Sequence, residues 1–441
     1  MRSLRILITN NTLAQRCGSE LYVRDVAIAL LRLGHRPVAY SRNLGTVADD
    51  LRLATVPVVD DLSQVGEPPD VIHGHHNLET MTALLHFPAT PAVFVCHGSM
   101  PWEEAPPPSP RIVRYVAVDD ACRDRLVFQH GVACDRIEVI PNFVDLERFR
   151  PRPALPERPA RALVFSNYAA DGTSLPAIRA ACEAESIEVD VAGLGSGRVL
   201  DRPEDVLGNY DLVFARARAA LEAMAVGAAV IACDFAGLGG FVTLRRFDEW
   251  RRLNFGLRCL QRPLDPAAIR GEIHAYDPAT AAAVSNRVRC EAGLDRALER
   301  ILMTYLRVIE EWRAAPSVDP VAESTAVATY LRQLEPRVKG HDSTLMKLVN
   351  ELATERQAHT SRLSELQGVI EALNSERTIR EALENSCEAA DRERTALRAE
   401  IDEIRQLRTY RLRSWLLQWP MLVSLYRSLS GRRPPSAFSD R

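Results

Sequence analysis

The stretch Leu4-Arg-Ile-Leu-Ile-Thr-Asn10 opens the chain with an apolar run of strand length. A loop with Gly18 follows, and then Glu20–Leu33, where apolar residues recur three and four positions apart up to Gly34. This periodicity predicts a helix, and a glycine directly after the last periodic residue is a common helix end. A strand, a loop with glycine and a helix form the opening unit of a parallel sheet covered by helices.

The same alternation continues in two series, separated by the proline-rich segment 151–159. That segment cannot be helix or inner strand, because each proline lacks an N–H donor and restrains the residue before it. The pattern predicts an α/β protein with two Rossmann-like domains that face each other across a cleft. The expected strands are Leu4–Asn10, Pro37–Ser41, Val56–Asp60, Val71–His75, Ala92–His97, Tyr115–Asp119 and Ile137–Pro141, then Ala162–Ser166, Glu188–Ala192, Asp211–Ala215 and Ala229–Cys233.

A long helical extension is expected after the second domain. From Leu345 the composition shifts to Glu, Arg, Leu and Ala, and Leu363, Leu366, Ile370 and Leu373 keep the spacing of a coiled coil. We therefore expect homo-oligomers, and a single solvated helix is the alternative. The expected segments are an N-terminal domain over 1–150, a hinge over 151–159, a second domain over 160–315, a linker over 316–342, a coiled coil over 343–408 and a basic, aromatic tail over 409–441.

Composition excludes some classes of protein. The chain has 441 residues and a net charge of -3, so it lacks the basic footprint of a nucleic-acid binder. Its nine cysteines show no C-x-x-C spacing, which favours reduced thiols inside the cell. The first apolar run is too short for a signal peptide. We expect a cytoplasmic protein.

The tail leaves two interpretations open. Residues 409–433 combine Trp415, Trp419 and Tyr426 with flanking arginines, and Pro420 interrupts their uncharged stretch. One interpretation is an interfacial helix on an anionic leaflet, which would make the protein peripheral at the inner face of the cell membrane. The other is docking on the protein's own surface or on a partner.

Two motifs point to chemistry. Arg16-Cys17-Gly18-Ser19-Glu20 lies between the first strand and its helix, where backbone N–H groups can hold a phosphate, although a plain capped turn also fits. Glu222 lies in an apolar helix expected over about 217–226. A buried carboxylate is costly unless it is paired, and a ribose diol would satisfy it. A solvent-facing glutamate is the alternative.

The chain resembles the retaining GT-B glycosyltransferases of the group 1 type, family 4, over about residues 1–314. Four segments carry the resemblance in the family's order. They are Gly18–His35 (GSELYVRDVAIALLRLGH), Asp70–His75 (DVIHGH) with Val95–Gly98 (VCHG), Ile137–Phe149 (IEVIPNFVDLERF) and Ala220–Gly227 (ALEAMAVG).

The resemblance implies transfer of a hexose from a nucleoside diphosphate sugar to a hydroxyl acceptor, such as a glycan or a lipid-linked precursor of a polysaccharide. No metal and no further cofactor are implied. His97 would face the reacting sugar as the catalytic residue, with a core histidine as the alternative, and His75 and Asn142 would shape the cleft. The expected donor-binding residues are Gly18, Ser19, Arg216, Arg218, Leu221, Glu222, Gly237 and Gly239.

Two departures from the family pattern matter. Phe214 stands where the family has a second glutamate, eight positions before Glu222. The family's Arg and Lys after the first strand of the second domain have no counterpart in Val164–Asp171. The charge of the leaving diphosphate must still be stabilised, and Arg216 and Arg218 are the candidates.

Two other functions stay open. One is a nucleotide-sugar epimerase, which would transform the donor without an acceptor. The other is a non-catalytic protein that binds nucleotide sugars or assembles partners through its coiled coil.

Overall fold

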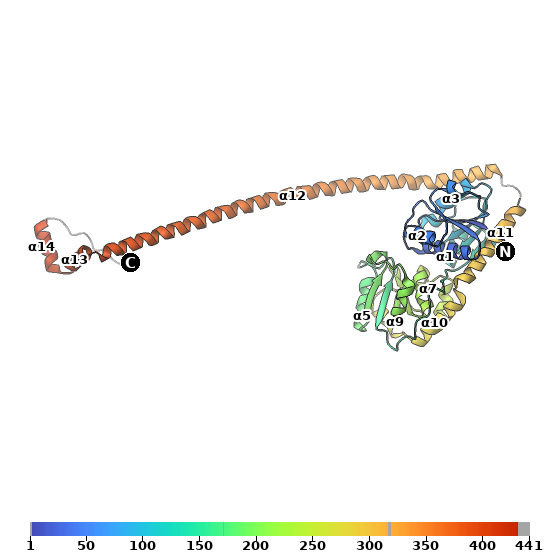
Figure 1. The fold of residues 1–441 in the computed structure, drawn as a ribbon, viewed down its shortest axis with the longest axis horizontal. Helices are drawn as coiled ribbons and strands as arrows, with labels where there is room; N and C mark the ends of the chain where they lie inside the picture. Colours follow the sequence, from blue (N-terminus) through green and yellow to red (C-terminus); the bar gives the residue numbers. More distant parts are fainter. Residues whose placement is uncertain (1, 171, 316–318, 431–441) are drawn as a thin grey trace. The chain divides into compact units, whose positions relative to one another are not determined.

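The structure is a computed structural model that describes residues 2–170, 172–315 and 319–430 (Figure 1). The chain divides into two units, one up to Glu335 and one from Pro336 onward. The first unit contains both predicted Rossmann-like domains, each built on a mainly parallel sheet. The predicted fold class is confirmed.

The N-terminal sheet has seven parallel strands in the order β3-β2-β1-β4-β5-β6-β7. The order reverses between β1 and β4, which is the switch point where such sheets bind ligands. The third strand is shorter than predicted, and the sixth begins and ends earlier. The strands are β1 Arg5–Thr9, β2 Arg36–Tyr40, β3 Val58–Val59, β4 Val71–His75, β5 Ala92–Cys96, β6 Ile112–Ala117 and β7 Ile137–Val139, and the helices among them are α1 Gly18–Arg32, α2 Thr46–Leu53, α3 Asn77–His86 and α4 Asp120–Phe128.

The second sheet has five strands in the order β12-β11-β10-β8-β9, with β12 antiparallel to β11. Sequence reasoning missed β12, because its glycine-rich sequence has weak strand propensity. The strands are β8 Arg161–Phe165, β9 Glu188–Ala192, β10 Leu212–Ala215, β11 Ala229–Asp234 and β12 Gly237–Phe241. The helices are α5 Leu175–Ala184, α6 Pro203–Val206, α7 Ala217–Val226, α8 Leu244–Arg251, α9 Pro266–His274 and α10 Pro278–Glu291, and 3-10 turns lie at Leu62–Gln64, Trp102–Glu104, Cys134–Arg136, Leu194–Ser196, Leu207–Asn209 and Leu257–Cys259.

The domain boundaries differ from the prediction. The chain leaves the first core after Phe143, since Val144 already packs in the second core. It returns at Gly293, and helix α11 (Leu294–Ala314) packs against the first sheet, not the second (Figure 1). The two segments where the chain crosses between the domains are hydrogen-bonded to each other. The Val144 N–H donates to Ala292 O at 2.8 Å, and the Leu294 N–H donates to Val144 O at 2.9 Å.

The expected hinge over 151–159 lies within the second domain. The Arg152 N–H donates to Val226 O at 2.8 Å, and the Arg152 guanidinium pairs with Asp211 at 3.0 Å. The Ala160 N–H donates to the same Asp211 carboxylate at 3.0 Å. The proline-rich segment is therefore bound to the second domain along its length and is not a hinge. The chain crosses between the domains a few residues earlier.

The expected linker over 316–342 is mostly helix. Helix α12 (Pro320–Gln406) begins at Pro320, because proline suits the first turn, and Asp319 Oδ1 accepts from the Val321 N–H at 2.9 Å. Its first turns pack on the N-terminal domain, where Glu323 pairs with Arg111 at 2.6 Å. Residues 316–318 lie outside the described residues.

The second unit is helical over its described residues. Helix α12 continues through the expected coiled-coil region as a single helix, and its leucine row is exposed in this chain. Association of that row with a second copy stays a prediction. Helices α13 (Arg408–Leu417) and α14 (Pro420–Ser430) follow. Of the helices described, none combines the length and the apolar character that crossing a bilayer requires.

Candidate active site

Helix α1 begins at Gly18, directly after the loop that follows β1. Cys17 precedes it in an extended conformation, so the first backbone N–H groups of the helix point out of its N-terminal end. A Cβ added at Gly18 would meet open space. The glycine therefore leaves the helix end uncovered, as binding of an anion there requires.

Helix α7 begins almost as soon as β10 ends. Arg216 alone separates Ala215 from Ala217, and Ala217 has a φ of 49°, a left-handed conformation that is strained for alanine. Its N–H donates to Phe255 O at 3.0 Å, which holds the tight turn. The turn places Arg216 and Arg218 at the N-terminal end of α7.

This turn corrects the interpretation of Phe214. The sequence pattern places the missing family glutamate at that position, but Phe214 lies within β10 and is fully buried in the core of the second domain. A carboxylate there would point into an apolar core. The turn between β10 and α7 is short, and Arg216 is its only residue.

The N-terminal ends of α1 and α7 line one cavity of about 360 Å³ between the two domains. Its walls combine both polar and aromatic side chains with the exposed helix ends. Glu222 reaches it from α7 and Asp234 from the end of β11. The lining residues are Arg16, Cys17, Gly18, Leu21, Phe165, Ser166, Asn167, Tyr168, Leu194, Arg216, Ala217, Arg218, Ala219, Glu222 and Asp234.

Glu222 is buried and paired. Arg218 Nε donates to Glu222 Oε1 at 2.7 Å, while among the residues that the structure describes Oε2 accepts no hydrogen bond. Burial raises the pKa of Glu222, and the charge of Arg218 only partly opposes this shift. The alternative of a solvent-facing glutamate is wrong. One carboxylate oxygen is held in place, in a residue that lines the cavity, and the other is left without a hydrogen bond from the described residues.

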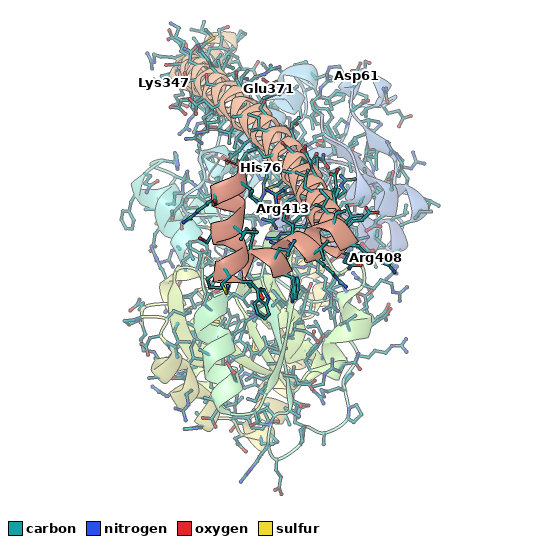
Figure 2. All side chains as sticks on the ribbon, turned by 90° about the vertical axis from the view of Figure 1, so that its left-hand side faces the viewer. Asp61, His76, Lys347, Glu371, Arg408 and Arg413 are labelled. Atoms are coloured by element: carbon teal, nitrogen blue, oxygen red, sulfur yellow. The ribbon has the colours of Figure 1, made fainter. Side chains whose placement is uncertain are left out.

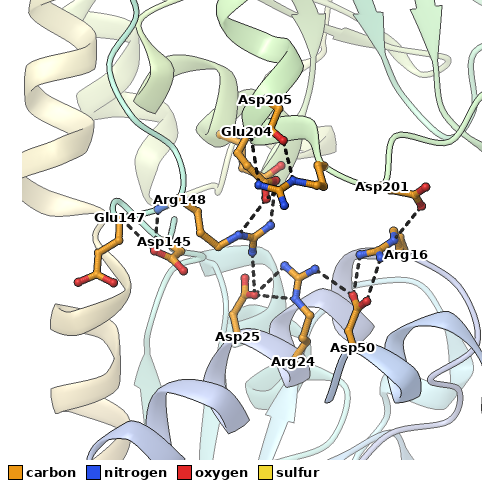
Figure 3. A network of polar contacts seen from close by, with 12 residues as sticks. Arg16, Arg24, Asp25, Asp50, Asp145, Glu147, Arg148, Asp201, Glu204 and Asp205 are labelled. Carbon is orange, nitrogen blue, oxygen red and sulfur yellow. Dashed lines mark hydrogen bonds and ion pairs between the residues drawn. The ribbon is translucent and has the colours of Figure 1, made fainter. Parts of the chain in front are cut away.

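Arg218 also connects the two domains. Its guanidinium pairs with Asp25 of α1. Asp25 in turn pairs with Arg24 at 2.7 Å and with Arg148 at 3.3 Å, as Figure 3 shows. Burial works to raise the pKa of Asp25, but these three arginines outweigh it and hold that pKa below its usual range. Sequence reasoning missed Asp25, because nothing in α1 distinguishes it from a surface residue.

Further ion pairs lie beside it. Arg148, in the first residues of the second domain, pairs with Glu204 of the same domain at 2.9 Å, in addition to its pair with Asp25 of the first domain (Figure 3). Arg16, before α1, pairs with Asp50 at 2.7 Å and reaches Asp201 at 3.4 Å. Charged groups of both domains therefore meet around the cavity, and this arrangement favours the closed position of the cleft.

Arg216 faces the cavity from the other side. Its guanidinium pairs with Asp234 and lies 5.3 Å from the centre of the Tyr168 ring and 6.0 Å from that of Phe235. Ser166 Oγ donates to Asp234 Oδ1 at 2.9 Å. Arg216 keeps about a quarter of its side chain exposed, whereas Arg218 is buried. Of the two predicted cations, Arg216 is thus the more exposed.

His97 belongs to a row of stacked histidines near the cleft. The His75 Nδ1 and His97 Nε2 atoms lie 2.6 Å apart, so one ring donates and the other accepts, and the rings of His73 and His75 are stacked at 4.5 Å. Burial lowers the pKa of His97 to about 4 and of His73 to about 3, and the pKa of His75 lies well below its ordinary value for the same reason. All three imidazoles are neutral at pH 7.

A carboxylate stands beside this row. Glu104 Oε2 accepts from the His97 N–H at 2.7 Å, and its other oxygen lies 3.5 Å from His76 Nε2. Burial alone would lower the pKa of His76, but Glu104 outweighs it and raises that pKa. No group of three metal-ligating side chains with the geometry of an ion site occurs within the described residues.

The remaining predicted residues are distributed as follows. Ser19 Oγ donates to Glu20 Oε2 at 2.9 Å beside Gly18, and Leu221 is buried in the core of the second domain. Gly237 and Gly239 lie in β12, outside the cavity lining. A Cβ at Gly237 would come within 2.7 Å of Leu260 O, so close packing of two backbones explains this glycine. Asn142 lies at the crossing between the domains, just before Phe143.

Two sheets that face each other across a polar cavity define the GT-B class of fold. The sequence model of Glycosyltransferase Family 4 matches residues 17–148, and it confirms the predicted family resemblance over that segment. No curated protein sequence matches the chain.

The first of two similar solved structures supports the fold. A glycosyltransferase from Rickettsia africae is similar with a TM-score of 0.52 and 14% identity, over 70% of this chain and 99% of that one. An Anabaena protein, Alr3699/HepE, solved in complex with UDP and glucose, is similar with a TM-score of 0.49 and 15% identity, over 68% of this chain and 99% of that one.

Proposed function

We propose that this chain is a glycosyltransferase that moves a hexose from a nucleoside diphosphate sugar to a hydroxyl acceptor and retains the anomeric configuration. The observation that carries the proposal is the single cavity where Gly18 at the start of α1 faces Arg216, Arg218 and Glu222 of the second domain. Two helix N-termini and an exposed cation suit a diphosphate, and a held carboxylate suits a ribose diol.

In the reaction, the bond between the anomeric carbon and the diphosphate oxygen breaks, and the diphosphate leaves with the electron pair. The acceptor hydroxyl oxygen forms the new bond to that carbon, and its proton passes to the departing phosphate. Arg216 and the N-terminal end of α1 stabilise the charge that develops on the leaving group. His97, neutral and held by His75, serves as a hydrogen-bond partner of the sugar.

We further propose that the acceptor is a glycan or a lipid-linked precursor of a polysaccharide. The ion pairs of Asp25 with Arg218 and of Arg16 with Asp201 support a closed cleft during transfer. Closure excludes water, which would otherwise compete with the acceptor hydroxyl.

The Glu222→Gln variant of the full chain is expected to bind its nucleoside diphosphate about 10- to 100-fold more weakly than the wild type. Charge-assisted hydrogen bonds to the ribose are lost, while the side-chain volume stays the same. Calorimetric titration with a panel of nucleoside diphosphates and their sugars measures the effect. Glu272→Gln is the matched control, since Glu272 is also a buried carboxylate paired with arginines but lies outside the cavity.

Binding of one nucleotide that survives Glu272→Gln and is lost with Glu222→Gln would support the donor site. A folded wild-type protein that binds none of the panel would overturn the proposed function and favour the non-catalytic scaffold.

Arg216→Gln is expected to weaken binding of the nucleoside diphosphate about tenfold or more, and to leave binding of the uncharged nucleoside nearly unchanged, because only the diphosphate meets this cation. Asp234 Oδ1 keeps hydrogen bonds from Ser166 Oγ and the Phe235 N–H, each at 2.9 Å, and the amide N–H₂ of glutamine offers a neutral donor to Oδ2 in place of the arginine. Arg246→Gln, in a paired arginine outside the cavity, is the control. Equal losses for nucleoside and diphosphate would contradict this role.

A non-catalytic nucleotide-sugar-binding protein is the second candidate, and the short turn between β10 and α7 favours it. That turn has no residue besides Arg216 to carry a carboxylate to the sugar. Incubating the bound donor and following release of the free nucleoside diphosphate separates the candidates. Release at the rate of the protein-free solution would favour this second candidate.

A further inference from the structure

Helices α13 and α14 have a composition unlike that of the long helix before them. Residues 408–430 contain four arginines and no acidic residue. Helix α12 carries charges of both signs, among them Lys347 and Glu371, whereas Arg408 and Arg413 stand in α13 (Figure 2). The tail is thus a locally cationic segment on a chain that is slightly acidic as a whole.

Helix α13 is amphipathic. Leu412, Trp415 and Leu416 follow one another at i, i+3 and i+4, which places them in one row along the helix, and Trp419 lies two residues beyond its end, beside Trp415. The side chains of Trp415 and Trp419 are 53% and 54% exposed, and their rings lie 5.9 Å apart. Arginines 411 and 413 flank the row on its two sides.

Helix α14 repeats the pattern. Met421, Leu425 and Leu429 are spaced four residues apart and are all exposed, Met421 by 84% and Leu429 by 80%. Arg427 lies about 120° to 160° around the helix from this row, at 3.6 residues per turn. Pro420 begins the helix, where a missing N–H costs nothing, so two short amphipathic helices follow one another at a bend.

The exposed apolar rows of α13 and α14, together with their arginines, indicate what kind of partner binds there. Exposed apolar rows of this size are unfavourable in water and mark an interaction surface. The occupant must accept apolar side chains, suit tryptophan at its boundary and carry negative charge. Each helix is only about 15 Å long, half of the hydrocarbon thickness of a bilayer, so it fits the interface plane and not a span.

We propose that α13 and α14 bind the surface of an anionic lipid bilayer. Trp415 and Trp419 lie at the level of the headgroups with the leucines below them, and Arg411 and Arg413 contact lipid phosphates. Aromatic residues with arginines on the polar side are typical of interfacial helices. The proposal does not depend on the nature of the transferred sugar.

Flotation of the full chain with lipid vesicles, without any nucleotide sugar, tests the proposal. The wild type is expected to float with phosphatidylcholine vesicles that contain phosphatidylglycerol, and to remain behind with phosphatidylcholine alone or at high ionic strength. Trp415→Ser together with Trp419→Ser is expected to weaken partitioning on the order of 100-fold, because two interfacial side chains are lost.

A charge pair gives the matched control. Arg411→Gln with Arg413→Gln is expected to weaken binding to anionic vesicles about 25-fold, at about fivefold for each arginine near the surface. Arg377→Gln with Arg380→Gln removes the same charge from α12, where each arginine pairs with a glutamate four residues on, and is expected to change binding roughly twofold or less. These variants sit on exposed positions and keep the fold.

Three outcomes would overturn the proposal. The wild type could fail to float with anionic vesicles, or the two arginine pairs could have equal effects. The tryptophan variants could also leave flotation unchanged and alter the sedimentation of the free protein, which would show that the apolar rows pack on another copy of the chain.

Discussion

Asp25→Ala is expected to lower the free energy of unfolding of the full chain by about 3–5 kcal/mol, the typical cost of breaking a buried ion pair by removing one partner. The Asp25 carboxylate is 3% exposed and pairs with Arg24, Arg148 and Arg218. Without it, the buried guanidinium of Arg218 keeps only Glu222. Urea unfolding followed by near-ultraviolet circular dichroism, which reports packed aromatic side chains, measures the change.

Asp49→Ala is the matched control for that experiment. Asp49 pairs with Arg52 at 3.1 Å on α2, but both side chains are largely exposed, so the variant is expected to cost about 0.5 kcal/mol or less. Similar small losses in the two variants would mean that Asp25 does not hold the domains together.

Acidification from pH 7 to pH 5 is expected to destabilise the protein through its histidine row. Burial lowers the pKa of His73 to about 3 and of His97 to about 4, and it lowers that of His75 as well, so these groups stay neutral when folded but take up protons when unfolded. The unfolded chain then binds more protons, and stability is lost as pH falls below about 6.5. Each of these histidines is expected to lower the free energy of unfolding by about 2 kcal/mol at pH 5, because the loss is about 1.4 kcal/mol for each pH unit below about 6.5.

His76 opposes this effect, since its raised pKa adds stability at low pH. The contribution of one histidine is therefore measured by difference, with His73→Asn, which keeps a polar partner for the Tyr305 hydroxyl. Its free energy of unfolding is expected to fall by about 2 kcal/mol less than that of the wild type between pH 7 and pH 5. His359→Asn, on the exposed surface of α12, is expected to follow the wild type. Parallel curves for all three proteins would contradict the assignment.

The order of strands and helices was predictable from local pattern. Apolar runs of strand length alternate with helical periodicity, and helix α7 was expected at about 217–226, where the structure has Ala217–Val226. Strand β12 was not predictable, because its glycines are explained by the approach of the Leu260 and Arg262 carbonyls, a tertiary contact that leaves no local periodicity.

The candidate site was predictable where one residue conflicts with its surroundings. Glu222 is a charged residue in an apolar helix, and Gly18 is a glycine in the loop between the first strand and its helix. Both features can be recognised in the sequence. Asp25, Glu104 and Asp234 are not, because each pairs with a residue of another element, Glu104 with His76 for example. Long-range pairing of charges is set by the fold and not by spacing.

The crossings at Val144 and Gly293 give the catalytic unit an unexpected architecture. Because α11 completes the core of the first domain, the second domain is an insert, from about 144 to 293, within a discontinuous host. A cut at 150 would leave the host without the side chains of Leu298, Ile301 and Tyr305. A chimaera that exchanges the second domain therefore needs two fusion points, which lie side by side in the structure. A single fusion point between an N-terminal and a C-terminal half would leave the core of the first domain incomplete.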